Sequence, residues 1–458
     1  MRYPYHHLRH PLIFYYAHPA VLYVNKLRVA GVLQTGINPA FESLFETGVD
    51  EMSWDDLSRS PVDWPPVAAV TEYRRAVYRL ISNVIAGLGS LTLPALRGTA
   101  GWAVVLGCEH ERIHLETSTV LMRELPLSLL LKPTAWPAAY DATCADSTCT
   151  PDNPMIEVGA REVVVGKESS FPSYGWDVEY GRLPVKVSPF RASKYPITNG
   201  QFLEFVKAGG YRSNHFWDVE GWRWRRFRNA KWPTFWVCDG PQGLNKYKLR
   251  LLFGLCDLPL SWPAVVNYWE ARAYCNWHSL QHDCKTRLMM ESEHLCIRSP
   301  NFQHTAAECD PILRNSGKSF RENKIANFNL AWGSETPVTL NSAVESDFFD
   351  AMGNVWEWSE DGNDCLPGFE VDTLYEDFSV PCFDGRHQII MGGSWMSTGN
   401  SASVFARYAF RPHFFQFAGF RVVEQISDAV PTSGGVCVRL EIPSQTGHGD
   451  HVLHSVSP

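Results

Sequence analysis

The sequence lacks several features that would place a protein in a familiar class. None of its twelve cysteines forms a CxxC pair, and the cysteines follow no regular spacing, so neither a zinc ribbon nor a disulfide framework is indicated. The first residues do not resemble a signal peptide, so we expect reduced thiols in a cytosolic protein. No apolar run reaches 20 residues, and the run 11–24 contains His18, so we expect no membrane-spanning helix.

The sequence also has no excess of positive charge. Its formal net charge is -8 at pH 7, which argues against nucleic acid or an anionic membrane as the main partner. It is rich in aromatic side chains, with 17 Trp, 17 Tyr and 25 Phe. Such large, flat side chains can build a compact, loop-rich domain. With 458 residues the chain is too long for one simple core, and we expect two domains.

The spacing of apolar residues predicts that the first part of the chain is helical. Residues 1–135 contain three long segments in which apolar side chains recur every three or four positions, as in helices that bury one face. These segments suffice for a bundle of about four helices with sites in its core. The helices are expected over 12–27, 71–88 and 101–125, with shorter pieces around 39–48 and 53–58.

The composition changes after this helical part. Residues 136–155 are rich in Pro, Asp, Ser and Thr, and we expect a linker there. Over 156–424, short β-like runs alternate with Gly, Pro and Asn turns, which is typical of a single loop-rich α+β domain. Residues 425–458 are rich in Ser, Gly, His and Pro and are expected to form a disordered tail. Inside the domain we expect strands within 156–165 and 185–190 and helices over 199–208 and 264–281.

The third predicted helix carries the residues with the clearest chemistry. It contains His-x3-His-x-Glu, with the histidines at His110 and His114. Histidines four apart lie on one face of a helix, so both imidazoles can reach one metal ion. His18, in an apolar stretch of the first predicted helix, is the best third ligand, because neighbouring helices of a bundle can bring it beside the pair. Glu116 points elsewhere on a straight helix, so we expect it to orient a ligand or to close a helix–helix contact.

Other interpretations of these histidines stay open at this stage. The pair can equally belong to a solvated charged face with ion pairs four residues apart. His6, His7 and His10 can replace His18 as ligand, although they resemble flexible terminal residues. Three imidazoles with open coordination positions suit Fe(II), Zn(II) or Cu(II), and the residues alone do not choose among these metals.

Together with the second part of the chain, the histidine motif resembles a known family. Four short segments occur in the order found in formylglycine-generating-enzyme-like domains, and Gly-Asn-Val-Trp-Glu-Trp is the most distinctive. Behind a His-x3-His-x-Glu helix, this order resembles the sulfoxide synthases of thiohistidine biosynthesis. The resemblance implies a DinB-like four-helix iron-binding bundle, followed by a formylglycine-generating-enzyme-like (C-type-lectin-like) α+β domain. The four segments are 263–277, 351–358, 392–395 and 418–421.

Within that family the chain resembles more closely the ovothiol branch, the 5-histidylcysteine sulfoxide synthases. The resemblance implies a non-haem Fe(II)- and O2-dependent enzyme that couples L-cysteine to the imidazole of L-histidine, giving 5-histidylcysteine sulfoxide. The full-length ovothiol enzyme also carries a methyltransferase domain. No glycine-rich nucleotide loop follows residue 421, so we expect a sulfoxide synthase without that domain, or a truncated form. The resembling segments are 8–15, 109–118, 172–177, 377–387 and 406–411.

The resemblance also assigns roles to individual residues. His18, His110 and His114 match the three iron ligands. Tyr375 best matches the active-site tyrosine that delivers a proton or a hydrogen atom during the reaction, and a packing aromatic is the alternative interpretation.

Arginines should bind the carboxylates of amino-acid substrates through paired hydrogen bonds. Arg407 and Arg411 are the candidates for this role, with structural salt bridges as the alternative. Two other functions stay open for the whole chain. The first is an ergothioneine-type synthase acting on γ-glutamylcysteine or cysteine and trimethylhistidine. The second is a non-catalytic binding module whose histidines hold a structural metal.

Overall fold

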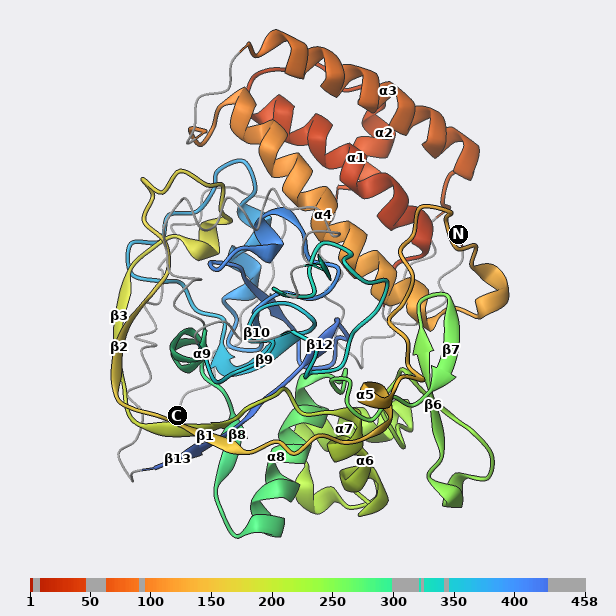
Figure 1. Cartoon of the computed structure of the whole chain (residues 1–458). Coiled ribbons are helices and arrows are strands. Elements are labelled where there is room, and N and C mark those ends of the chain that lie inside the picture. Colours follow the sequence, from red (N-terminus) through yellow and green to blue (C-terminus); the bar gives the residue numbers. More distant parts are fainter. Residues whose placement is uncertain are drawn as a thin grey trace.

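The computed structural model consists of a helical part packed against a body of helices and small sheets (Figure 1). No helix in the described residues is both long and apolar enough to cross a membrane. The expected tail over 425–458 lies almost entirely outside the described residues. The structure describes residues 1–2, 9–46, 63–89, 95–298, 321–322, 325–341 and 346–426.

The helical part contains the long helices that the sequence predicts. Helix α1 is buried on nearly all sides, and Pro19 lies inside it. It packs against α3 and α4, around a core that includes Phe14, Val21 and Phe45. The short helix expected around 39–48 ends earlier, and the one around 53–58 lies outside the described residues. The helices are α1 (Leu12–Val29), α2 (Pro39–Leu44), α3 (Val67–Gly87) and α4 (Ala100–Glu124).

Within the described residues, the rest of the chain forms two four-stranded sheets and two smaller ones. One sheet has the order β1-β4-β13-β8 and the other β11-β10-β9-β12. Neighbouring strands of the two sheets are antiparallel, except that β12 runs parallel to β9. The strands of the two larger sheets are β1 (Met155–Val158), β4 (Phe190–Ser193), β8 (Thr286–Leu288), β9 (Trp356–Gly362), β10 (Gln388–Met391), β11 (Arg407–Phe410), β12 (Ala418–Gly419) and β13 (Val422–Gln425).

The expected strand and helix segments are present, with shifted or split boundaries. The run 156–165 is two strands, and the expected helix over 264–281 begins only at Tyr268. Asn267 caps that helix in a reciprocal capping box with Glu270, and Pro263 precedes it outside the helix. The remaining elements are β2 (Arg161–Val165), β3 (Leu183–Val187), β5 (Trp236–Cys238), β6 (Tyr247–Leu251), β7 (Gly254–Asp257), α5 (Ala145–Thr148), α6 (Asn199–Lys207), α7 (Val219–Arg228), α8 (Tyr268–His282) and α9 (Glu291–Ile297).

Residues 136–155, expected as a linker, lie packed against the body of the molecule. The Tyr140 amide donates to Ser334 Oγ at 2.9 Å. The Trp262 indole N–H donates to Ser147 Oγ at 3.0 Å, and Ser147 is buried in α5. Buried polar groups that are satisfied in this way hold a segment in place, so the segment joins the body instead of separating two bodies.

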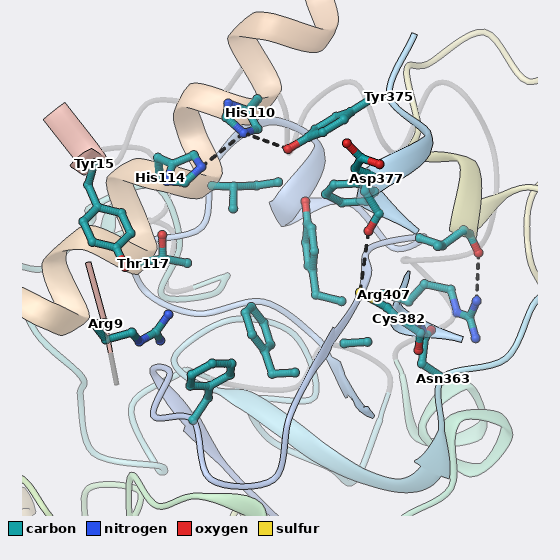
Figure 2. Close-up of a pocket in the computed structure, with 17 residues that line it drawn as sticks. Arg9, Tyr15, His110, His114, Thr117, Asn363, Tyr375, Asp377, Cys382 and Arg407 are labelled. Carbon is teal, nitrogen blue, oxygen red and sulfur yellow. Dashed lines mark hydrogen bonds between the residues drawn. The ribbon is translucent and has the colours of Figure 1, made fainter. Parts of the chain in front are cut away.

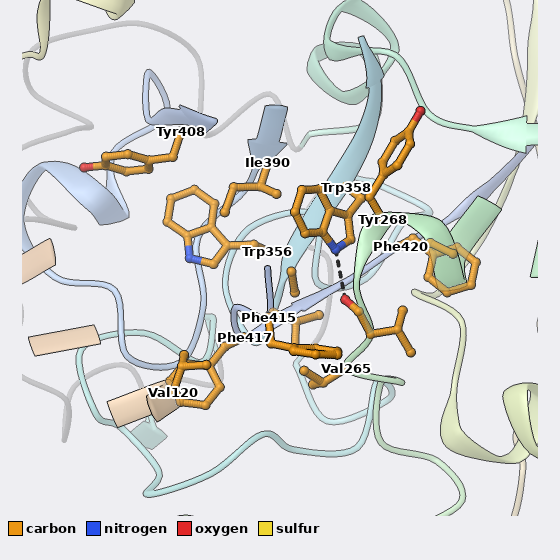
Figure 3. Packing of buried hydrophobic residues seen from close by; sticks show 14 of the residues in the cluster. Val120, Val265, Tyr268, Trp356, Trp358, Ile390, Tyr408, Phe415, Phe417 and Phe420 are labelled. Atoms are coloured by element: carbon orange, nitrogen blue, oxygen red, sulfur yellow. Dashed lines mark hydrogen bonds between the residues drawn. The ribbon is translucent and has the colours of Figure 1, made fainter. Parts of the chain in front are cut away.

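Helix α4 connects the two parts of the molecule. It lies between the other helices and the strands β9 and β10 (Figure 1). One side of it joins the core of the helical part through Leu121. Val120 joins the aromatic core of the body, together with Trp356 and Phe417 (Figure 3). The helix that carries the predicted histidine pair is therefore buried in two cores at once.

Candidate metal centre and adjoining cavity

Three imidazoles meet where α1 and α4 pack together. His18 comes from α1, and His110 and His114 come from successive turns of α4. The Nε2 atom of His110 lies 3.1 Å from the Nε2 atom of His18 and 3.1 Å from that of His114. One ring nitrogen from each histidine can be chosen so that all three lie within 4.8 Å of one another. The structure therefore brings together the three residues that the sequence selects as ligands.

Burial keeps these imidazoles neutral. It lowers the pKa of His18 to about 4, and the cationic Lys26 acts in the same direction. Burial also lowers the pKa values of His110 and His114 well below the usual value, and the neighbouring imidazoles add to the effect. A neutral imidazole is the form that binds a metal ion.

The orientation of His18 is fixed by its other ring nitrogen. His18 Nδ1 lies 2.7 Å from the carbonyl oxygen of Phe45, so Nδ1 carries the proton and Nε2 presents a lone pair. Three Nε2 atoms that face one another cannot all be satisfied by hydrogen bonds among themselves. In the described part of the chain, the Nδ1 atoms of His110 and His114 have no hydrogen-bond partner. The donor set therefore fits a cation with a preference for imidazole, such as Fe(II), Zn(II) or Cu(II).

Tyr375 lies beside this cluster, on a loop of the body. Its hydroxyl is 3.4 Å from His110 Nε2 (Figure 2). The Lys26 ammonium group lies over the ring, 4.3 Å from its centroid. Burial raises the pKa of the Tyr375 phenol, and Asp377 and Cys382 add to the rise, so the hydroxyl stays protonated and can donate.

A cavity of about 160 Å³ opens next to His110, His114 and Tyr375. Several aromatic rings line it, and polar groups stand at several points around it (Figure 2). Sequence reasoning did not select these polar groups as site residues, although Arg9, Asp377 and Cys382 lie in segments that carried the family resemblance. Besides Arg407, the polar side chains are Arg9, Thr117, Asn363, Asp377 and Cys382, and besides Tyr375 the aromatic ones are Tyr15, Phe378, Tyr408, Phe410 and Phe414.

The body of the molecule matches a known family model. The model of the Sulfatase-modifying factor enzyme 1-like domain matches residues 144–426, which is more than half of the chain. The chain belongs to this family. Residues 144–426 are called the family domain below, and residues before 136 are called the helical part.

Three curated relatives cover between 51% and 92% of the chain. "Ergothioneine biosynthesis protein 1" of Neurospora crassa is 24% identical over 490 residues, covering 92% of this chain and 54% of its own length. "Hercynine oxygenase" of Mycobacterium tuberculosis is 27% identical over 241 residues, or 51% of each chain. "Hercynine oxygenase" of Mycolicibacterium thermoresistibile is 26% identical over 376 residues, covering 78% of this chain and 74% of its own. The chain spans about half the length of the first two relatives.

Arg407 of the family domain lines the cavity but is already fully engaged. Its Nε and Nη2 atoms donate to the two carboxylate oxygens of Glu291 at 2.8 and 3.1 Å. Its Nη1 donates to the carbonyl oxygen of Val178 at 2.8 Å, and Nη1 and Nη2 both donate to that of Asp364 at 3.3 and 3.4 Å. A guanidinium has five N–H donors, so none is left for a substrate carboxylate. The geometry thus gives Arg407 the alternative role, a structural salt bridge.

Arg411 does not line the cavity beside the histidines. Its guanidinium lies 3.5 Å from a carboxylate oxygen of Asp384, and it faces a separate surface pocket with Trp269 and His413. A second arginine, Arg9, lines the histidine cavity beside Arg407, and its guanidinium lies 4.0 Å from the centroid of the Phe414 ring. The signal for Arg9 was its place in the resembling segment 8–15, just before α1.

Glu116 extends from α4 into the family domain. Its carboxylate accepts hydrogen bonds from the Trp356 indole N–H at 2.7 Å and from the hydroxyls of Ser394 and Ser397 at 2.6 and 2.9 Å. No hydrogen bond joins it to a histidine within the described residues. Its contact joins a helix to a sheet domain and is not the helix–helix contact that was one expected role, while its role in orienting a ligand stays a prediction.

Proposed function

We propose that this chain is an O2-dependent sulfoxide synthase that joins the sulfur of a cysteine-type thiol to the imidazole of a histidine derivative. Fe(II) would be held by His18, His110 and His114 in a DinB-like bundle. The observation that carries the proposal is the meeting of three neutral imidazoles, two buried and one half-buried, with the Tyr375 hydroxyl beside a cavity. The names of the relatives, a hercynine oxygenase and an ergothioneine biosynthesis protein, support an oxygenase of this class.

The protein's own residues would position the reactants and move a proton. Bound iron would supply the one-electron chemistry that O2 requires. Tyr375 would hold its hydroxyl oxygen 3.4 Å from His110 Nε2. Its proton would then lie within reach of substrates bound in the cavity. The aromatic walls would exclude water, which strengthens each polar contact inside. Arg9 would attract a substrate carboxylate, since its side chain also lines this cavity.

Two histidine substrates fit the proposal, and trimethylhistidine is favoured. The relatives are named for hercynine and ergothioneine. The cavity offers the rings of Phe378 and Tyr408 and the carboxylate of Asp377, and such groups attract a methylated ammonium. The second candidate is L-histidine with L-cysteine, as in the ovothiol branch, and it rests on the resembling sequence segments.

The test is a product assay with matched substrates. Protein loaded anaerobically with Fe(II) would receive O2 together with each pairing of L-cysteine or γ-glutamylcysteine with L-histidine or trimethylhistidine. Mass spectrometry should find a coupled sulfoxide, formed with O2 uptake, and the preferred pairing identifies the branch. Protein loaded with Zn(II) is the control, since zinc performs no redox chemistry. Purified protein holding stoichiometric zinc, with no O2 uptake on Fe(II), would favour a non-catalytic module and refute the proposal.

A further inference from the structure

The helix that carries the histidine pair also carries two buried carboxylates, Glu109 and Glu116. They are seven residues apart, which is close to two helical turns, so they lie on the same side of α4. Both contact the family domain, and neither contacts a histidine by any hydrogen bond within the described residues. The helix thus presents imidazoles on one side and carboxylates on another.

Three hydrogen-bond donors of the family domain surround the carboxylate of Glu116. Trp356 comes from β9, and Ser394 and Ser397 follow β10, so adjacent strands supply them. In the described part of the chain, no lysine, arginine or histidine forms an ion pair with Glu116. Hydrogen bonds alone therefore join its carboxyl group to the family domain. An apolar side chain here would leave three buried donors unsatisfied.

Glu109 holds the same segment of the family domain two turns earlier. Its carboxylate accepts a hydrogen bond from the Asn400 amide at 2.8 Å and pairs with Arg112. The Asn400 side chain in turn donates to Glu179 at 2.5 Å. A Cβ atom on Gly399 would lie within 2.6 Å of Glu109 Oε2, so the helix and the segment are in close contact. The two carboxylates together hold residues 394–400.

We propose that Glu116 is a positioning residue that fixes α4 on the family domain and thereby sets His110 opposite Tyr375. The inference rests on the proposed function for its link to turnover. The three histidines lie within the helical part, on α1 and α4, so they can gather without this contact. Tyr375 belongs to the family domain, so its 3.4 Å approach to His110 depends on how the two parts are joined. Loss of Glu116 should therefore separate metal binding from turnover.

The experiment compares Glu116→Ala with Glu116→Gln and with a matched control, Glu124→Ala. Glu124 is also a carboxylate of α4 that contacts the family domain, through Arg228 at 3.7 Å, but it is two to three turns beyond the histidine pair. Three quantities would be measured: the affinity for Fe(II), the hydrogen exchange of the amides in 394–400, and kcat with the preferred substrates.

Glu116→Ala should leave the metal affinity within about threefold of wild type, while kcat falls roughly 10–100-fold, as is usual for residues that act through a ligand's surroundings. Exchange of the 394–400 amides should rise at least about tenfold, since their contact with α4 opens. Glu116→Gln keeps an acceptor oxygen and should be less affected. Glu124→Ala should match wild type in the exchange of 394–400.

Wild-type exchange at 394–400 in Glu116→Ala would overturn the inference, and so would a loss of metal affinity that parallels the loss of kcat. If Glu116→Ala does not fold, the Ser394→Ala, Ser397→Ala double variant tests the other side of the contact by the same readouts. If wild-type protein makes no product from any substrate pair, the proposed function fails, while exchange and metal affinity still decide whether Glu116 joins the two parts.

Discussion

The helical part has three imidazoles that face one another at its centre, whereas the family domain contains buried arginines that pair with glutamates. Arg421 donates to both carboxylate oxygens of Glu357, at 2.9 and 3.0 Å, and both residues are buried. The three Nε2 atoms of the histidine cluster lie together, and among the described residues no carboxylate forms an ion pair with any of these histidines. Arginine–glutamate pairs of this kind hold the fold together. A cluster of ring nitrogens that cannot satisfy one another instead marks a place where a ligand is expected.

The difference predicts opposite responses to mutation. Removal of one member of a satisfied pair leaves a buried charge alone, which destabilises the fold. Removal of one imidazole from the cluster takes away a ligand but leaves no charge unpaired. Mutations in the histidine cluster should therefore reduce function, whereas mutations in the arginine–glutamate pairs should reduce stability.

The largest effect is expected for His110→Ala. His110 Nε2 lies at the centre of the cluster, 3.1 Å from each of the other two Nε2 atoms. Loss of this ligand should weaken Fe(II) binding by more than the ~10–100-fold typical of the groups around ligands, and O2-dependent coupling should vanish. The midpoint of urea unfolding of the metal-free protein should change little. Full coupling activity in this variant would disprove the iron assignment.

Tyr375→Phe should have the next largest effect on turnover. The variant keeps the ring that lies between Lys26 and His110 but lacks the hydroxyl. Loss of a positioned proton donor costs ~10²–10⁴-fold in rate, so kcat for sulfoxide formation should fall by about that factor. Fe(II) affinity and unfolding should stay close to wild type. A variant that couples at the wild-type rate would show that Tyr375 only packs.

Arg421→Met tests the scaffold side of the comparison. Arg421 is fully buried and also donates to the carbonyl oxygens of Ser193 and Lys194, at 3.1 and 2.6 Å. Its loss leaves Glu357 buried without its partner, which costs about 3–5 kcal/mol of the free energy of unfolding. Urea denaturation should show this loss, while folded protein at low temperature should still bind Fe(II). Unchanged stability would contradict the structural role of the pair.

Glu270 provides a test of pH dependence away from the histidines. Burial raises its pKa to about 7, against hydrogen bonds from Tyr211 and Asn267 that lower it. Because the folded-state pKa is raised, the folded protein binds the proton more tightly. This contribution to stability is complete below pH ~4.5 and is lost as the pH rises to about 7. Urea midpoints across this range should fall less steeply with pH in Glu270→Gln than in wild type, and equal slopes would contradict the shift.

Much of the helical part can be predicted from the sequence, because its signals are local. The spacing of apolar residues gives α1, α3 and α4 to within about four residues at each end. The four-residue spacing of His110 and His114 places both on one face of a helix. Their meeting with His18 could only be expected from the family resemblance and from general bundle packing, since 92 residues separate His18 from His110.

The family domain is harder to predict because its contacts are between distant segments. Helix α7 has a charged sequence, Val-Glu-Gly-Trp-Arg-Trp-Arg-Arg-Phe-Arg, without a clear apolar stripe, and no helix was expected there. Arg407 was expected to bind a substrate carboxylate, but its guanidinium instead binds the carboxylate of Glu291, 116 residues away. The hydrogen-bond donors to Glu116 come from residues that lie 240 to 281 positions later in the sequence. Such pairings follow from the fold and not from local spacing.

The smallest effect is expected for Lys26→Met, which probes the contact between α1 and the Tyr375 loop. The Lys26 ammonium lies 4.3 Å from the centroid of the Tyr375 ring, and the nearby charges are carboxylates, including Asp372 and Asp377. A cation over an aromatic ring contributes about 0.5–2 kcal/mol, so kcat should fall by about 2–30-fold if the contact holds the ring towards His110. Met fills similar space without the charge, so packing is largely kept.

Lys194→Met is the matched control for Lys26→Met, because Lys194 also lies over aromatic rings, those of Tyr195 and Phe349, but in a part of the family domain that does not line the cavity. It should leave kcat unchanged, and Lys26→Arg should restore most of the activity that Lys26→Met loses, since a guanidinium also stacks on a ring. Equal loss in Lys26→Met and Lys194→Met would mean that such cations only stabilise the fold. A loss confined to Lys26 would show that α1 supplies both a ligand, His18, and the group that holds the tyrosine in place.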